Sequence, residues 1–152
     1  MTGMSGTGKS SALERLRLLG FRTVDTDEGD WSDWSEPDGG YVWREERIAE
    51  LLASDEGPCL YVSGTVSNQG RFYDRFDAIV LLSAPANVLL RRIGARTTNP
   101  YGKTAAQREL VLRDLAEAEP RLRRTCTHEI DATQPLGDVV TQLVAIGRDA
   151  SA

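Results

Sequence analysis

A chain of 152 residues, 40% of them apolar, is long enough to bury one hydrophobic core, which excludes an intrinsically disordered protein. The formal net charge of −5 argues against extended binding to a nucleic acid duplex, because that requires a basic surface. The apolar runs are too short to span a membrane and the two cysteines lack a metal or redox spacing, so we expect a reduced, cytoplasmic protein without a nucleic acid or membrane partner.

The first pattern in the chain is a phosphate-binding loop at residues 3–10. Its letters, GMSGTGKS, fit G-x-x-x-x-G-K-[ST], in which the glycines let backbone N–H groups turn inward around a phosphate chain. Lys9 is expected to reach the outer phosphates, and Ser10 to ligate Mg²⁺. Leucines at helical spacing over residues 11–19 predict a helix whose positive end points at the same anion. The residues expected to bind ATP here are Gly3, Ser5, Gly6, Thr7, Gly8, Lys9, Ser10 and Ser11.

The strand that should carry this loop is short. Only Met1 and Thr2 precede Gly3, whereas a strand of ordinary length needs about five residues. We expect either that the true chain starts upstream of Met1 or that the first strand of the sheet is truncated.

Two carboxylates follow the next predicted strand, residues 21–25. Asp25 and Asp27 are alternate residues of an extended segment, so both are expected to face one site at the carboxyl end of the sheet. One suits Mg²⁺, which favours oxygen ligands, and the other suits the orientation or deprotonation of an acceptor hydroxyl. The alternative is a solvated turn closed by an Asx hydrogen bond.

The remaining elements alternate between helices and strands, which predicts an α/β fold with a parallel sheet covered on both faces and a single domain over residues 1–152. In chain order we expect a loop at 26–40, a helix at 42–53, a strand at 59–63, a polar loop at 64–70, a short helix at 71–76, a strand at 78–82, a helix at 86–95, a polar loop at 96–103, a long helix at 105–124 interrupted near Pro120, a strand at 127–131 and a helix at 136–146.

The phosphate-binding loop followed by the Asp25/Asp27 pair resembles the shikimate kinase branch of small P-loop kinases, which is close to the nucleoside monophosphate kinases. The resemblance implies a P-loop NTPase three-layer sandwich with a five-stranded parallel sheet in the order 2-3-1-4-5. It also implies ATP-dependent transfer of the γ-phosphoryl group to a small-molecule hydroxyl, with Asp25 near Mg²⁺ and Asp27 on the acceptor. Trp43-Arg44 matches an aromatic–Arg pair whose Arg grips the acceptor's carboxylate.

The acceptor side also departs from that family. Arg47 stands where a Glu is expected, and the triple glycine after the third strand is replaced by residues 63–70, SGTVSNQG. The acceptor region is expected over about 26–56, and the acceptor stays open between a hydroxy acid, a sugar-like or antibiotic metabolite and a nucleotide. The residues expected to bind it are Asp27, Arg44, Gly64, Asn68 and Arg71.

A basic segment, with nine Arg or Lys against four Asp or Glu between Arg91 and Arg124, is either a pair of solvated helices or a site for polyphosphate. The resemblance implies a mobile lid at about 97–108. Arg92 and Arg96 share one helix face and are expected to meet the nucleotide, with Lys9, Asp27 and Arg96 as the catalytic residues.

The last strand leads into residues 130–135, IDATQP, which resemble the loop that cradles adenine in this group and place Thr133 and Pro135 at the base. The alternative is a plain strand-to-helix turn.

ATP and Mg²⁺ are the expected cofactors, and a monomer or weak dimer is the expected oligomeric state. Two other functions stay open: a nucleoside monophosphate kinase that uses Arg44, Arg47 and Arg71, or a nucleotide-binding switch or ATPase without a second substrate.

Overall fold

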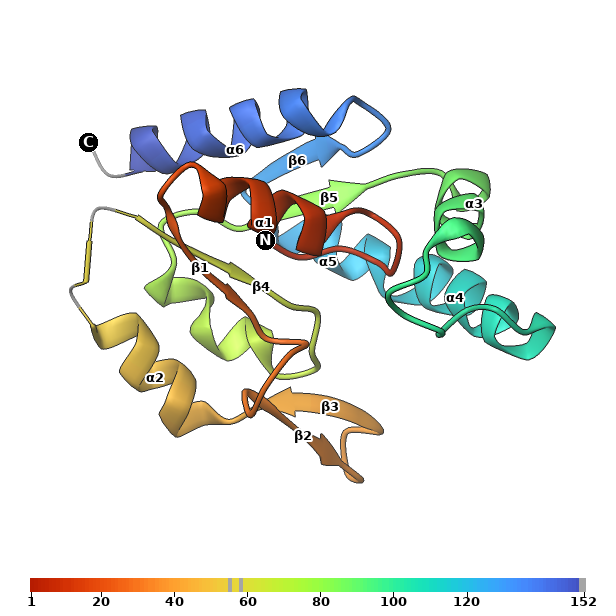
Figure 1. The fold of residues 1–152 in the computed structure, drawn as a ribbon. Coiled ribbons are helices and arrows are strands. Elements are labelled where there is room, and N and C mark those ends of the chain that lie inside the picture. Colours follow the sequence, from red (N-terminus) through yellow and green to blue (C-terminus); the bar gives the residue numbers. More distant parts are fainter. Residues whose placement is uncertain (55, 58, 151–152) are drawn as a thin grey trace.

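The computed structural model describes residues 1–54, 56–57 and 59–150, which form a mixture of helices and strands (Figure 1). The elements are α1 (Lys9–Leu18), β1 (Arg22–Asp25), β2 (Ser32–Ser35), β3 (Gly40–Trp43), α2 (Glu45–Ala53), β4 (Leu60–Ser63), the 3₁₀ helix η1 (Gln69–Arg75), β5 (Val80–Ser83), α3 (Ala86–Ala95), α4 (Ala105–Glu117), α5 (Glu119–Thr125), β6 (His128–Asp131) and α6 (Leu136–Ala150). Across these described residues, no helix combines the length and the apolar character needed to cross a membrane.

Two pairs of parallel strands, β1 with β4 and β5 with β6, are joined through the first residues of the chain. The Thr2 N–H donates to the Val80 carbonyl at 2.8 Å, and the Leu82 N–H donates to the Thr2 carbonyl at 2.9 Å. On the other side, the Met1 amino group donates to the Val62 carbonyl at 2.6 Å. Residues 1–2 therefore lie between β4 and β5.

The α/β class predicted from the sequence is confirmed, whereas the predicted count and order of five strands are not. The described residues form three two-stranded sheets, because the segment before the phosphate-binding loop makes a single bridge, Thr2 to Leu81, instead of a full strand.

Helices cover both faces of these strands. Figure 1 shows α1 and α6 together on one side, where Leu16 and Leu143 pack with Leu82 in one apolar cluster. On the other side, Trp43 and Ile48 belong to a second cluster with Val62 and Phe72. β5 is apolar and buried along most of its length, as expected for a strand that is covered on both faces.

The prediction of a loop over residues 26–40 was wrong in part. β2 and β3 form an antiparallel hairpin in which Ser32 pairs with Trp43 and Trp34 with Tyr41. The rings of Trp34 and Tyr41 make an edge-on contact with centroids 5.5 Å apart. Cross-strand aromatic pairs of this kind stabilise hairpins, and they outweigh the turn-forming Asp, Ser and Gly residues around them. α2 consequently begins at Glu45, three residues later than predicted.

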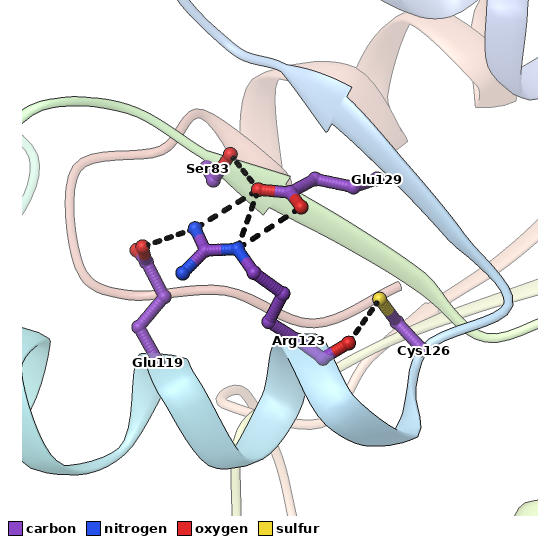
Figure 2. Close-up of polar contacts among 5 residues, drawn as sticks. All are labelled: Ser83, Glu119, Arg123, Cys126 and Glu129. Atoms are coloured by element: carbon purple, nitrogen blue, oxygen red, sulfur yellow. Dashed lines mark hydrogen bonds and ion pairs between the residues drawn. The ribbon is translucent and has the colours of Figure 1, made fainter.

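An ion-pair network attaches α5 to β5 and β6 (Figure 2). Arg123 of α5 donates through Nε to both carboxylate oxygens of Glu129 at 3.1 and 3.0 Å, and through Nη2 to the buried Glu119 at 2.7 Å. The Ser83 hydroxyl of β5 donates to the same Glu129 at 2.7 Å. Arg123, and then Ser83, lower the pKa of the Glu129 carboxyl. The predicted interruption near Pro120 is confirmed, because α4 ends at Glu117 and α5 starts at Glu119.

We predict that Arg123→Met lowers the free energy of unfolding by about 1–2 kcal/mol, because it leaves the buried Glu119 without its charged partner. The expected loss is no larger because solvent screens the half-exposed guanidinium group. Chemical denaturation at pH 7 measures this. Arg124→Met removes the same charge from a neighbouring exposed residue and should change stability little.

The same ion-pair network should make the free energy of unfolding depend on pH. Since the folded-state pKa of Glu129 lies below the ordinary 4.5, its contribution is present above that pH and is lost as the pH falls through the lowered pKa. The stability difference between the wild type and Arg123→Met should therefore shrink below pH 4.5. An equal difference at all pH values would contradict the assignment.

Candidate active site

The phosphate-binding loop leaves the strands where the backbone comes unusually close to β5. Gly3 has φ of 149°, and a Cβ atom there would lie 2.4 Å from the Leu82 carbonyl oxygen, so only glycine fits. The Thr65 hydroxyl, just past β4, supports the same residue by accepting from the Gly3 N–H at 3.2 Å and lying 2.9 Å from the Gly3 carbonyl. Sequence reasoning missed Thr65, whose only signal was its position at a strand end.

The phosphate-binding loop offers backbone N–H groups as hydrogen-bond donors. Within the part of the chain that the structure describes, the N–H groups of Gly6, Gly8 and Lys9 contact no acceptor. Lys9 is also the first residue of α1, and the N-terminal end of a helix carries partial positive charge. These groups fit a phosphate chain. Thr7 closes the loop from inside, where its hydroxyl donates to the Met4 carbonyl at 2.9 Å, and Ser11 is exposed on the first turn of α1.

The Lys9 ammonium folds back over the loop. Its Nζ donates to the carbonyls of Gly3 at 2.6 Å and Met4 at 3.3 Å. Burial lowers the pKa of Lys9, the carboxylates of Asp27 and Asp25 oppose that shift, and Arg96 adds to it. Lys9 is therefore a poorly hydrated cation, whose charge an arriving phosphate would stabilise.

The predicted magnesium ligands lie in direct contact. The Ser10 hydroxyl donates to Asp25 Oδ2 at 2.8 Å. Two oxygens suit Mg²⁺, because that ion keeps several waters and takes phosphate oxygens as its other ligands. No group of three or more His, Cys, Asp or Glu that could enclose a metal occurs among the described residues. The alternative Asx turn is present as well, since the Asp27 N–H donates to Asp25 Oδ1 at 3.2 Å.

Thr26 sets the direction of both aspartates. It is buried, donates to the Ser63 carbonyl at 2.8 Å and accepts from Trp43 Nε1 at 2.8 Å. Because successive residues of an extended segment face opposite ways, the inward Thr26 leaves Asp25 and Asp27 on the outer side. Gly64 packs against it so closely that a Cβ atom would lie 2.1 Å from the Thr26 hydroxyl.

Asp27 is exposed, but the surrounding protein still affects its proton affinity. Partial desolvation raises the pKa of Asp27, Lys9 opposes the shift, and Asp25 and Glu28 strengthen it. A carboxylate with a raised pKa is a better proton acceptor than an ordinary aspartate.

Arg92 of α3 and Arg96, which directly follows α3, contact different segments instead of one common point. Arg96 Nη1 lies 3.4 Å from the Ser5 hydroxyl of the phosphate-binding loop, and Nη2 donates to the Tyr101 carbonyl at 2.9 Å. Arg92 Nη2 donates to the Ala132 carbonyl at 2.7 Å, which attaches α3 to the loop after β6. In that loop the Thr133 N–H and hydroxyl donate to Asp131, and Pro135 precedes α6.

The predicted acceptor residues are mostly occupied by internal partners. Arg44 makes a bidentate pair with Asp33, at 2.8 Å from Nε and 2.7 Å from Nη2. Asn68 is buried, and its amide pairs with both backbone groups of Trp43 at 2.8 and 3.0 Å. Arg71 pairs with Glu45. The structure therefore gives Asn68 a supporting place, and it gives Arg44 an acidic partner that sequence reasoning did not find.

The chain is similar to known proteins in both sequence and structure. A family model described as an AAA domain matches residues 1–119. Shikimate kinase 2 of Yersinia enterocolitica is 29% identical, with 98% of this chain and 94% of that protein covered. The shikimate kinase of Oleidesulfovibrio alaskensis is 30% identical, with 96% of this chain and 94% of that protein covered.

Two solved structures share the fold. A shikimate kinase from Acinetobacter baumannii in complex with shikimate has a TM-score of 0.63 at 17% identity, with 95% of this chain and 89% of that chain covered. A gluconokinase from Sinorhizobium meliloti 1021 has a TM-score of 0.66 at 23% identity, with 99% and 90% covered.

We predict that Asp25→Asn raises the Mg²⁺ concentration needed for half-maximal ATP binding by roughly tenfold, because an amide is a weaker ligand than a carboxylate. Titration calorimetry with ATP at a series of Mg²⁺ concentrations measures the midpoint. Asp114→Asn, which removes an exposed carboxylate on α4, should leave it unchanged. An unchanged midpoint in Asp25→Asn would remove Asp25 from the metal site.

Proposed function

We propose an acceptor class and residue roles for this chain. The chain belongs to the AAA domain family and is an ATP-dependent small-molecule kinase of the shikimate kinase type, and the proposal starts from there. The chain uses ATP with Mg²⁺. The acceptor that we propose is a small polyhydroxylated carboxylic acid, phosphorylated on a hydroxyl group.

The observation that carries this proposal is the position of Asp27 just after β1, where its N–H donates to Asp25, which accepts from Ser10 of the phosphate-binding loop, and where Lys9 affects its pKa. Asp27 orients the acceptor hydroxyl and takes its proton as the oxygen attacks the γ-phosphorus, and the bond from that phosphorus to the leaving ADP oxygen breaks. Lys9 and Arg96 stabilise the charge on the phosphoryl oxygens. Ser10 and Asp25 hold Mg²⁺, which when bound neutralises phosphate charge. Most of the acceleration then comes from positioning and electrostatics.

We assign the rest of the nucleotide site to the ends of α3 and β6. The free N–H groups of residues 3–11 hold the phosphates, and the loop with Thr133 and Pro135 cradles the adenine. Arg92 supports that loop through the Ala132 carbonyl. The lid extends over about 97–108.

A carboxylate on the acceptor follows from Arg44. Its guanidinium already holds one carboxylate, that of Asp33, in the planar two-bond geometry that carboxylates favour, and both side chains are about half exposed. Arg47 and Arg71 are likewise paired with exposed carboxylates, those of Asp30 and Glu45, and Gly64 packs against Thr26. We assign these residues to the acceptor region, about 26–56 and the residues next to it. Two of the similar proteins are named after hydroxy acids, shikimate and gluconate.

We further propose that the chain forms one domain with a single sheet in the order β1, β4, residues 1–3, β5, β6, which is the order 2-3-1-4-5. The hydrogen bonds of Met1 and Thr2 to both neighbouring strands support it. A cytoplasmic location agrees with the free thiols of Cys59 and Cys126.

The test is ADP release from ATP, measured with a panel of hydroxy acids, neutral sugars, nucleosides and nucleoside monophosphates. We expect hydroxy acids to stimulate release at least about tenfold and their neutral analogues to stimulate it little. Stimulation by monophosphates alone would show a nucleotide kinase. Release that no acceptor stimulates would show a switch or ATPase.

A second prediction concerns Asp27. Asp27→Asn should lower kcat for phosphoryl transfer by about 10²- to 10⁴-fold, because the amide cannot accept the proton, while ATP affinity stays within about threefold. Asp114→Asn, which removes an exposed carboxylate on α4, serves as the control and should keep most of the activity.

The dependence of kcat/KM on pH should follow the protonation of Asp27. Since the pKa of Asp27 is raised, its protonated, inactive form persists above the ordinary 3.8, and kcat/KM should rise with pH through that raised value. The residual activity of Asp27→Asn should lack this acidic limb. Lost ATP affinity in Asp27→Asn would instead assign the residue to the nucleotide site.

A further inference from the structure

The side chain of Lys103 attaches the turn between α3 and α4 to the end of α3. Its Nζ donates to the Gly94 carbonyl at 2.7 Å and to the Arg96 carbonyl at 2.5 Å. The last carbonyls of a helix have no intrahelical partner and carry the negative end of the helix dipole, so an ammonium group is a favourable cap there.

The same turn packs directly on α3. Gly102 is buried with φ of 86°, and a Cβ atom at this position would lie 2.3 Å from Ile93 Cγ2. Gln107 of α4 closes the turn from the other side, where its Oε1 accepts from the N–H groups of Gly102 at 3.0 Å and Lys103 at 3.2 Å. Thr104 and Gln107 also form the capping box that starts α4. The turn is therefore a defined structure held at both ends.

Arg96 is held by this turn and by the phosphate-binding loop together. Its carbonyl accepts from Lys103, its Nη2 donates to the Tyr101 carbonyl, and its Nη1 approaches the Ser5 hydroxyl. Its Nε is buried and contacts no acceptor in the ranges 1–54, 56–57 and 59–150. Burial without a full set of partners leaves a donor that an anion at the loop would satisfy.

We infer that Lys103 is a positioning residue: it fixes the turn 101–104 on the end of α3 and thereby holds the Arg96 guanidinium beside the phosphate-binding loop, ready for the terminal phosphate of ATP. This inference rests on the proposed role of Arg96 in the nucleotide site. Lys103 itself acts through Arg96 and contacts no phosphate.

The test is a double-mutant cycle read by nucleotide binding. Titration calorimetry compares the magnesium complexes of a non-hydrolysable ATP analogue and of ADP, and the ratio of their affinities isolates the terminal phosphate. We expect Lys103→Met to lower this ratio roughly tenfold, the loss expected for one charge-assisted hydrogen bond. Arg96→Met should lower it similarly, and the double variant no further than Arg96→Met alone.

Two matched variants complete the experiment. Lys103→Arg, which can still donate to both carbonyls, should restore the ratio to within about threefold, and Arg113→Met, which removes an exposed charge on α4, should leave it unchanged. Additive losses in the double variant, or an unchanged ratio in Lys103→Met, would overturn the inference.

Since binding is read without an acceptor, this result is independent of the acceptor panel. A panel in which no acceptor stimulates ADP release would reject the proposed kinase acceptor and leave the cycle interpretable. With an active acceptor, Lys103→Met should lower kcat and leave the KM of the acceptor within about twofold.

Discussion

The position of Met1 and Thr2 between β4 and β5 is the constraint on which the site depends. Their hydrogen bonds to Val62, Val80 and Leu82 place the phosphate-binding loop beside the carboxyl ends of β4 and β5. β4, which neighbours them, is followed by Thr65, which contacts Gly3, and β1, which pairs with β4, ends at Asp25 beside Ser10. The backbone pairing of two residues thus determines which side chains lie around the phosphate-binding loop.

Each cation of the site already holds an internal oxygen. Lys9 rests on the Gly3 carbonyl, Arg96 on that of Tyr101, Arg92 on that of Ala132, and Arg44 on the Asp33 carboxylate. A ligand must therefore replace these contacts and not merely add to them, so the net gain is smaller than the new hydrogen bonds suggest. In return, the cations stay ordered before any ligand arrives, which limits the entropy that binding removes.

Local chemistry explains which parts of this arrangement were predictable. The phosphate-binding loop, the Asp25/Asp27 pair and the buried strand β5 follow from residue types at fixed spacing, and the structure brings Ser10 and Asp25 together as expected. The hairpin β2–β3 was missed because its signal is a cross-strand pair of aromatic rings, which no single segment displays. The partners of Arg44 and Asn68 were missed for the same reason, since Asp33 and Trp43 reach them only after the chain folds back.

The inward side chain of Thr26 fixes the segment that carries the two aspartates, whereas the tip of the hairpin β2–β3 can change in length. Its bonds to Ser63 and Trp43 fix the alternation of residues 25–27, so a one-residue insertion there would exchange the inner and outer faces and bury both carboxylates. The turn at residues 36–39 of the hairpin has no such restriction, because it only joins two paired strands. Under the proposed acceptor assignment, insertions at that tip would reshape the acceptor wall and leave the phosphate-binding loop in place, which makes the hairpin a graft point for altering substrate choice.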